Sequence, residues 1–235
     1  SDRVCLGFLF GDVSDTLSQL IRTAIVAKEG YTLCVADFSA IEARVIAWLS
    51  GETWRQKVFA EGGDIYCASA SSMFGVPVVK HGVNGHLRQK GKVAELSLGY
   101  CGGVNALKAM GALDMGLTEE ELPNIVALWR QASPKIKELW YTVEKAAVYT
   151  VTTGNPMTID HGITFRLEVD PFYGYRYMTI ELPSGRKLFY PDPHIKLNNF
   201  DKEAVHFKTQ LNNAWVTEST YGGKLVENIT QAVAR

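Results

Sequence analysis

The chain has 235 residues, of which 46% are hydrophobic and 21% charged, and its formal net charge is −1. This composition shows no disorder signature and allows one large or two smaller packed domains. No run of eighteen or more apolar residues and no charged-then-apolar leader is visible, so we expect no membrane span, no secretory signal and a cytoplasmic setting. The cysteines form no C-x-x-C pair, which argues against a zinc site. Residues 80–108 contain five Lys or Arg against one acid, Glu95, so any basic surface is local.

The segment Cys34 to Arg44, CVADFSAIEAR, places two carboxylates around a predicted strand-to-helix junction. The apolar run at residues 33–36 is typical of a buried strand that delivers Asp37 at its end. Ser39 and Glu42 have the S-x-x-E spacing of a capping box, which predicts a helix over about 40–49. Asp37 is therefore either a turn residue or a metal ligand, and Glu42 either a capping residue or a functional acid.

The next part of the chain, residues 64–147, has the pattern of successive helices. Asp64 is suited to cap a helix that ends before Gly75, and Asn84 or His86 precedes a second helix. Ser133 and Pro134 predict the start of a third. Its apolar residues repeat at helical spacing on one face, namely Ile136, Trp140, Val143 and Ala147.

The remainder of the chain changes from helical to alternating patterns after the sequence Gly-Asn-Pro at 154–156. Met178, Ile180 and Leu182 alternate before the turn at 183–185, and a return strand is predicted at 187–190. Residues 157–193 are therefore predicted to form antiparallel hairpins. Residues 209–235 have helix-like texture, and we expect a helix there.

Within the helical part, four side chains recur every fourth residue: Arg88, Lys92, Leu96 and Tyr100. On a helix they form one stripe about 18 Å long, with cations at its N-terminal end and an aromatic ring at its C-terminal end. A nucleoside triphosphate fits this gradient, because Arg and Lys bind phosphate while the apolar side chains meet sugar and base. An ordinary amphipathic surface helix has the same pattern, and the stripe alone does not separate the two interpretations.

Together, DFSAIEAR and R-x3-K-x3-L-x3-Y resemble motifs A and B of the family A (DNA polymerase I type) DNA polymerases, in the variant found in bacteriophages and prophages. The resemblance implies an α+β fold: an antiparallel-sheet palm with an inserted, mostly helical fingers domain, a partial right-hand polymerase. The implied domains are palm at 1–62, fingers at 63–153 and palm again at 154–235. The implied function is template-directed transfer of dNTPs to a primer 3′ end.

The resemblance also implies a role for each matching residue. Asp37 would bind two catalytic Mg²⁺ ions, with the Phe38 backbone carbonyl as a further ligand. Arg88 and Lys92 would hold the triphosphate, and Lys92 is a candidate proton donor to the pyrophosphate. Glu42, hydrogen-bonded to Tyr100, would exclude a ribose 2′-OH.

Several positions depart from the family pattern. Leu96 stands where the family has Phe or Tyr, and Tyr66 replaces a His that contacts phosphate, so it can donate a hydrogen bond but no charge. In the tail, Gln231 matches a residue that contacts the primer-template minor groove. Lys224 is a candidate contact to the DNA backbone.

The second metal-binding Asp of the family, in an H-D-E motif, is absent from the sequence. We therefore expect a fragment that lacks this motif, the thumb and the exonuclease, and that does not extend primers efficiently alone. A non-catalytic nucleotide- or DNA-binding module is the rival from another class. A single-subunit RNA polymerase is the rival enzyme, and Glu42 argues against it.

Overall fold

The computed structural model describes residues 13–235. The chain divides into two compact units, Ser1–Ser39 and Ala40–Arg235. The first unit contains helix α2 (Val13–Leu20) and the short 3-10 helix η1 (Ile21–Ala24). Cys5 lies outside the described residues. The second unit contains the other helices and all the strands that the structure describes.

The strand predicted at residues 33–36 is absent, and this prediction was wrong. The segment has no regular structure, and Val35 is 90% exposed. A strand needs a neighbour that pairs with its backbone N–H and C=O groups, and the described part of the first unit contains no other strand. The apolar run alone could not supply that partner.

Helix α3 (Ile41–Ser50) confirms the predicted helix but not its capping box. Ala40 occupies the N-cap position in the left-handed conformation, with φ 52 and ψ 42, and no side chain caps the helix. The cap position therefore falls one residue later than the S-x-x-E spacing requires. This frees Glu42 for another partner. At the other end Gly51 takes a positive φ of 70 and closes the helix.

Helices are the main regular structure of the second unit, and those after α3 are listed here in chain order: α4 (Thr53–Ala60), α5 (Ile65–Phe74), α6 (Leu87–Leu98), α7 (Val104–Ala109), α8 (Leu122–Ala132), α9 (Pro134–Thr153) and α10 (Gly222–Ala234). As predicted, Asp64 caps α5, accepting hydrogen bonds from the N–H groups of Tyr66 at 2.9 Å and Cys67 at 3.2 Å. The predicted start of α9 at Pro134 is also confirmed.

The strands form two antiparallel sheets, in agreement with the predicted α+β fold. One has the order β1-β2-β3-β4 (Met157–Thr158, Thr164–Val169, Arg176–Glu181, Lys187–Pro191), with the 3-10 helix η2 (Asp160–Gly162) after β1. The other has the order β5-β6-β7 (His194–Leu197, Glu203–Leu211, Ala214–Ser219). The three apolar residues of the predicted pattern, Met178, Ile180 and Leu182, are all at most 3% exposed, and Thr179 between them is also buried, so the middle of β3 is covered on both faces.

Residues 209–219 form strands rather than the expected helix, which begins only at Gly222. Asn212 and Asn213 have φ values of 49 and 62, the double positive φ of a two-residue hairpin turn. Leu211 pairs with Ala214 across this turn. The tail is therefore a hairpin followed by a helix, because Asn tolerates the left-handed conformation that closes tight turns.

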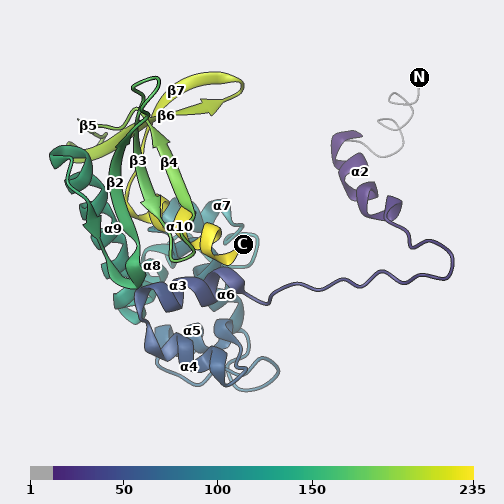
Figure 1. Cartoon of the computed structure of the whole chain (residues 1–235). Helices are drawn as coiled ribbons and strands as arrows, with labels where there is room; N and C mark the ends of the chain where they lie inside the picture. Colours follow the sequence, from purple (N-terminus) through teal and green to yellow (C-terminus); the bar gives the residue numbers. More distant parts are fainter. Residues whose placement is uncertain (1–12) are drawn as a thin grey trace. The chain divides into compact units, whose positions relative to one another are not determined.

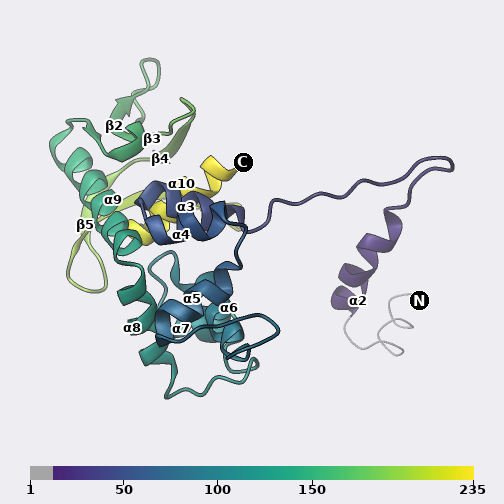
Figure 2. The same ribbon diagram turned by 90° about the horizontal axis from the view of Figure 1, so that it is seen from below.

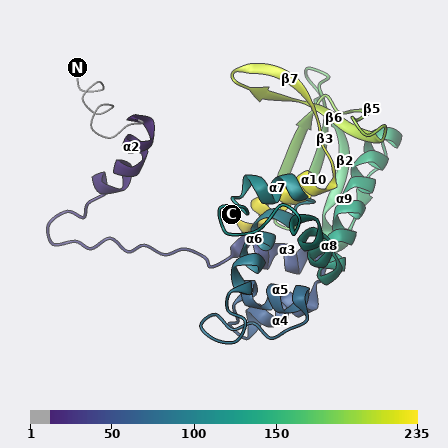
Figure 3. The ribbon, with the colours of Figure 1, turned by 180° about the vertical axis from the view of Figure 1, so that it is seen from behind.

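One continuous core joins the helices to the sheets in the second unit. In Figure 1, α9 runs along the first sheet beside β2, and the view from behind shows the same pair in contact (Figure 3). Helix α10 packs against α9 and α3, and the view from below shows α5 and α6 together on the far side of α3 (Figure 2). Trp129 and Trp140 stack at 6.2 Å in this core. The predicted palm and fingers boundaries stay a prediction.

Candidate active site

Helix α6 carries the predicted phosphate-binding stripe. Its buried face is made of small and aliphatic side chains, including Gly91, Val93 and Leu98, which pack toward α5, α7 and α8. On the other side Arg88 and Lys92 are half-buried, and Leu96 is 46% exposed. The helix ends at Leu98, so Tyr100 continues the stripe from the following turn.

Arg88 is directed toward the N-terminus of α5. Its Nε donates to Asp64 Oδ2 at 2.8 Å, and its guanidinium lies 5.2 Å from the centre of the Tyr66 ring. The hydrogen bond to Asp64 raises the pKa of Arg88 above its ordinary value. The guanidinium keeps its charge, and two predicted site residues, Arg88 and Tyr66, are in contact.

Asp64 has two tasks at this point, capping α5 with one oxygen and holding Arg88 with the other. Partial burial by itself would raise its pKa. The hydrogen bonds from Arg88 and from the backbone N–H groups of Cys67 and Tyr66 outweigh burial, and the pKa of Asp64 lies below its ordinary value. The sequence indicated only the capping role, because nothing in the local pattern pairs residues 24 positions apart.

Glu42 and Tyr100 form the hydrogen bond that the resemblance led us to expect. The Tyr100 hydroxyl donates to Glu42 Oε2 at 3.3 Å, joining the start of α3 to the end of the stripe. Burial raises the pKa of Tyr100 far above its ordinary value, and the Glu42 carboxylate adds to the shift. The hydroxyl therefore stays protonated and acts as a donor.

The two lysines near the middle of α6 differ in their partners. Lys90 Nζ makes a short ion pair with Glu121, the N-cap residue of α8. Lys92 makes no ion pair within the described part of the chain. Its ammonium is thus the cation of the stripe that stands available for an anionic ligand.

Asp37 and Phe38 belong to the first unit, whereas Glu42, Arg88 and Tyr100 belong to the second. Asp37 and Phe38 are both exposed, and the exposed fraction of Phe38 is 77%. Carboxylate and carbonyl oxygens are donors of the kind that Mg²⁺ takes. Across residues 13–235, however, the structure has no group of three or more His, Cys, Asp or Glu side chains that could hold a metal ion.

The two predicted DNA contacts lie on α10 and share a partner there. Lys224 Nζ is 3.0 Å from Glu227 Oε2, and Gln231 Nε2 donates to Glu227 Oε1 at 3.4 Å. Exposed pairs of this kind contribute little to stability and exchange readily for other partners. The helix approaches its neighbours closely at its start, because a Cβ on Gly223 would lie 2.4 Å from the Tyr100 carbonyl oxygen.

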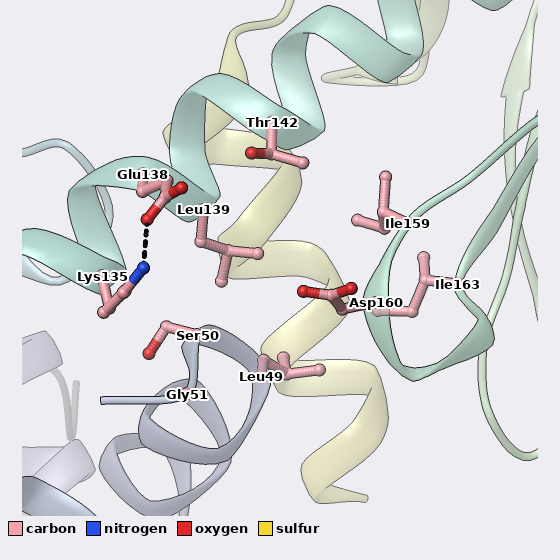
Figure 4. A pocket seen from close by; sticks show the side chains of 10 residues that line it. All are labelled: Leu49, Ser50, Gly51, Lys135, Glu138, Leu139, Thr142, Ile159, Asp160 and Ile163. Atoms are coloured by element: carbon pink, nitrogen blue, oxygen red, sulfur yellow. Dashed lines mark hydrogen bonds and ion pairs between the residues drawn. The ribbon is translucent and has the colours of Figure 1, made fainter. Parts of the chain in front are cut away.

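A pocket elsewhere in the second unit contains none of the predicted site residues. It lies between the end of α3, the start of α9 and the β1–β2 link (Figure 4). The ion pair of Lys135 with Glu138, at 2.8 Å, stands at one side, and Asp160 faces it from the other. The stripe on α6 is therefore separate from this hollow.

Within the described range no helix is long and apolar enough to cross a membrane.

Comparison with known proteins gives the relationship of the chain. The family model for DNA polymerase family A matches residues 12–156, more than half of the sequence. The chain belongs to DNA polymerase family A. The DNA polymerase of Bacillus phage SP02 is 52% identical over 229 residues, which are 97% of this chain and 34% of the phage protein.

More distant family A relatives include the thermostable DNA polymerase I of Thermus thermophilus and that of Thermus aquaticus. They are 38% and 35% identical over 125 residues, 53% of this chain and 14% of each relative. The chain thus spans about a third of the phage polymerase and about a seventh of the Thermus proteins. The family A match ends before β1, so the strands belong to the part that the phage relative covers and the family model does not.

Proposed function

We propose that the second unit binds a deoxynucleoside triphosphate along α6 and that the chain serves template-directed DNA synthesis in a family A polymerase. The observation that supports this most directly is the Tyr100–Glu42 hydrogen bond, which joins an acid to the C-terminal end of a stripe that begins with cations. Family membership supports the same assignment. The stripe alone fits many surface helices, but the stripe with this acid suits a deoxynucleotide.

In this proposal each group acts on a particular part of the nucleotide. Lys92 and Arg88 bind the phosphates, and their charge opposes the negative charge that builds up on the departing pyrophosphate. Arg88 must release Asp64 or share its remaining N–H groups to do so, since Nε is already occupied. Lys92 is also positioned to give a proton to the leaving group.

Sugar selection would come from Glu42. Its carboxylate is held in position by the Tyr100 hydroxyl, so a ribose 2′-OH in this place would clash with it. Leu96 offers an aliphatic surface beside it, and Tyr100 an aromatic ring. Tyr66 would donate its phenol to a phosphate oxygen beside Arg88, without adding charge.

Asp37 and the Phe38 carbonyl would hold Mg²⁺, which supplies charge stabilisation at the attacking and leaving oxygens when it is bound. These two donors do not complete a coordination shell, so the ion would need further oxygen ligands. The part of this proposal that concerns primer-template DNA assigns Lys224 to the DNA backbone and Gln231 to the minor groove.

The test uses a pair of neighbouring lysines on one helix. The affinity of the chain for dNTP is measured by isothermal titration calorimetry. The unchanged chain is expected to bind, and Lys92→Ala is expected to weaken the affinity by about tenfold or more. Lys90→Ala is the matched control and should change affinity by less than about twofold, because Lys90 is directed to Glu121. Equal effects of the two variants would refute the assignment of the stripe.

A second experiment addresses sugar selection and DNA contacts. Glu42→Ala should raise affinity for ribonucleotides relative to deoxynucleotides, and an unchanged ratio would remove Glu42 from the sugar site. Lys224→Ala should lower the salt dependence of DNA binding by about one phosphate contact, close to 0.9 in the slope of log affinity against log salt. Primer extension by this chain with Mg²⁺ should stay far below that of an intact polymerase.

A further inference from the structure

A buried ion pair lies on the side of α6 that faces the protein interior. Arg55 on α4 is 1% exposed, and its Nη1 binds Oε2 of Glu95, whose side chain is 4% exposed. The other Glu95 oxygen accepts from Trp129 Nε1 of α8 at 2.9 Å. Both carboxylate oxygens of Glu95 are therefore occupied by groups from two different helices.

The same arginine reaches the start of the long helix α9. Its Nη2 donates to Ser133 Oγ at 2.7 Å. Its guanidinium also lies over the rings of Trp54 and Trp129, at 4.6 Å and 5.2 Å from their centres. Arg55 thus connects α6 with α4, α8 and α9, and the two indole rings restrict its rotation.

A buried ion pair of this kind is poorly explained by stability alone. Removing two charges from water is costly, and apolar residues of similar volume often serve as well or better. A charged pair also fixes the orientation of the elements that carry it, because its hydrogen bonds form only when the two groups face each other. The position of Glu95 on α6 suggests what is being oriented.

Glu95 lies three residues after Lys92 and one before Leu96, within the length of the stripe. Gly91, one turn earlier on the same side, allows α6 to approach α5, because a Cβ there would lie 2.2 Å from the Tyr66 carbonyl oxygen. Gly91 sets how close the helix lies to α5, whereas the bonds of Glu95 depend on the rotation of the helix about its own axis. A rotation of α6 would move Lys92 away from the exposed surface and break the bonds of Glu95.

We propose that Glu95 and Arg55 are positioning residues that fix the rotation of α6 and so present Lys92 and Leu96 to the nucleotide. This inference rests on the proposed function for the meaning of the stripe, but its physical core concerns α6 alone. Neither residue touches the nucleotide. Their substitution should change affinity through the helix that carries the binding groups.

The test compares variants that alter the pair with one that spares it. Glu95→Gln keeps an acceptor for Trp129 but removes the charge that faces Arg55, and Arg55→Met removes the cation at similar length. Ser133→Ala is the control, because it removes a different bond of the same arginine and leaves α6 untouched. Calorimetric dNTP titration and hydrogen exchange of the α6 amides are measured below the unfolding temperature of every variant.

Both single variants should weaken dNTP binding by roughly tenfold or more and speed exchange along α6, and Ser133→Ala should do neither. The double variant Arg55→Met/Glu95→Gln removes the unpaired buried charge and should regain stability without regaining affinity. Affinity that returns together with stability, or an equal loss in Ser133→Ala, would overturn the positioning role. If the unchanged chain fails to bind dNTP while the exchange pattern is as expected, the proposed function fails and the orientation of α6 by this pair stands.

Discussion

Gly91 is the point at which the packing of α6 on α5 is most sensitive to a single added atom. A Cβ at this position would lie 2.2 Å from the Tyr66 carbonyl oxygen and 3.0 Å from the Ala70 Cβ. The carbonyl belongs to the backbone of α5 and cannot rotate away. Gly91→Ala must therefore push α5 and α6 apart. This would also move Arg88 on α6 away from Asp64 and Tyr66 at the start of α5.

Two opposing terms determine the size of the effect. Alanine is favoured over glycine inside a helix by about 1 kcal/mol. Overpacking of a well-packed site costs about 1–3 kcal/mol, and a clash with backbone at this distance belongs at the upper end or beyond it. We expect Gly91→Ala to lower the free energy of unfolding by about 1–2 kcal/mol.

Gly99 provides the matched control, because it is also buried and, directly after the last residue of α6, keeps helical backbone angles, with φ −57 and ψ −24. A Cβ there would have its nearest neighbours at 3.9 Å, an ordinary contact. Gly99→Ala should therefore leave stability unchanged or raise it by up to about 1 kcal/mol. Urea denaturation followed by circular dichroism measures both variants, with coincident transitions checked by fluorescence. If Gly91→Ala proves as stable as Gly99→Ala, the close packing of α5 on α6 is not as described.

Three further predictions concern stability. Trp140→Phe should lower the free energy of unfolding, measured by urea denaturation, by about 1–3 kcal/mol, because the Gly99 carbonyl loses the buried 2.8 Å hydrogen bond from Nε1. The control is Tyr141→Phe at an exposed position, which should change this free energy by no more than about 0.5 kcal/mol. The depressed pKa of Asp64 contributes stability above its unfolded pKa, and this stability is lost as pH falls through the folded value. The stability difference between the unchanged chain and Asp64→Asn should therefore shrink as pH falls below the ordinary Asp pKa of about 4. A difference that is constant with pH would contradict the Arg88–Asp64 pair. Asn213→Ala should destabilise the β6–β7 hairpin by about 1 kcal/mol, with Asn213→Gly neutral, in thermal melts; equal melting temperatures for the two would argue against the positive φ of 62.

Local patterns predicted helices α3, α5, α6 and α9 because their signals lie within a few residues. Asp64 before α5 and Pro134 at the start of α9 are examples, since capping and a fixed φ act on adjacent backbone. The alternation of Met178 and Ile180 likewise identified β3. The misassigned hairpin at 209–219 shows the limit, because the two asparagines that close it were not recognised as a turn.

The residues around the stripe were predictable only in part. The sequence indicated Arg88, Lys92 and Tyr100 by their spacing, and the resemblance added Glu42 as their partner. Nothing in the sequence indicated that Arg88 is held by Asp64. Nothing indicated either that Glu95, the one acid in a basic segment, pairs with Arg55 from another helix. Each of these pairs joins positions far apart in the chain, and no local spacing reports them.

By itself the sequence determined the starts of α5 and α9, the cation-to-aromatic order of the stripe and the family to which the chain belongs, because short motifs and adjacent residues carry this information. The tertiary structure alone decided which charges are paired and which cation faces outward. Lys90 and Lys92 are two residues apart and chemically identical, yet Lys90 meets Glu121 and Lys92 meets no ion-pair partner in the described part of the chain. A helix turns by about 100° per residue, so what each side chain meets depends on the helices packed around it.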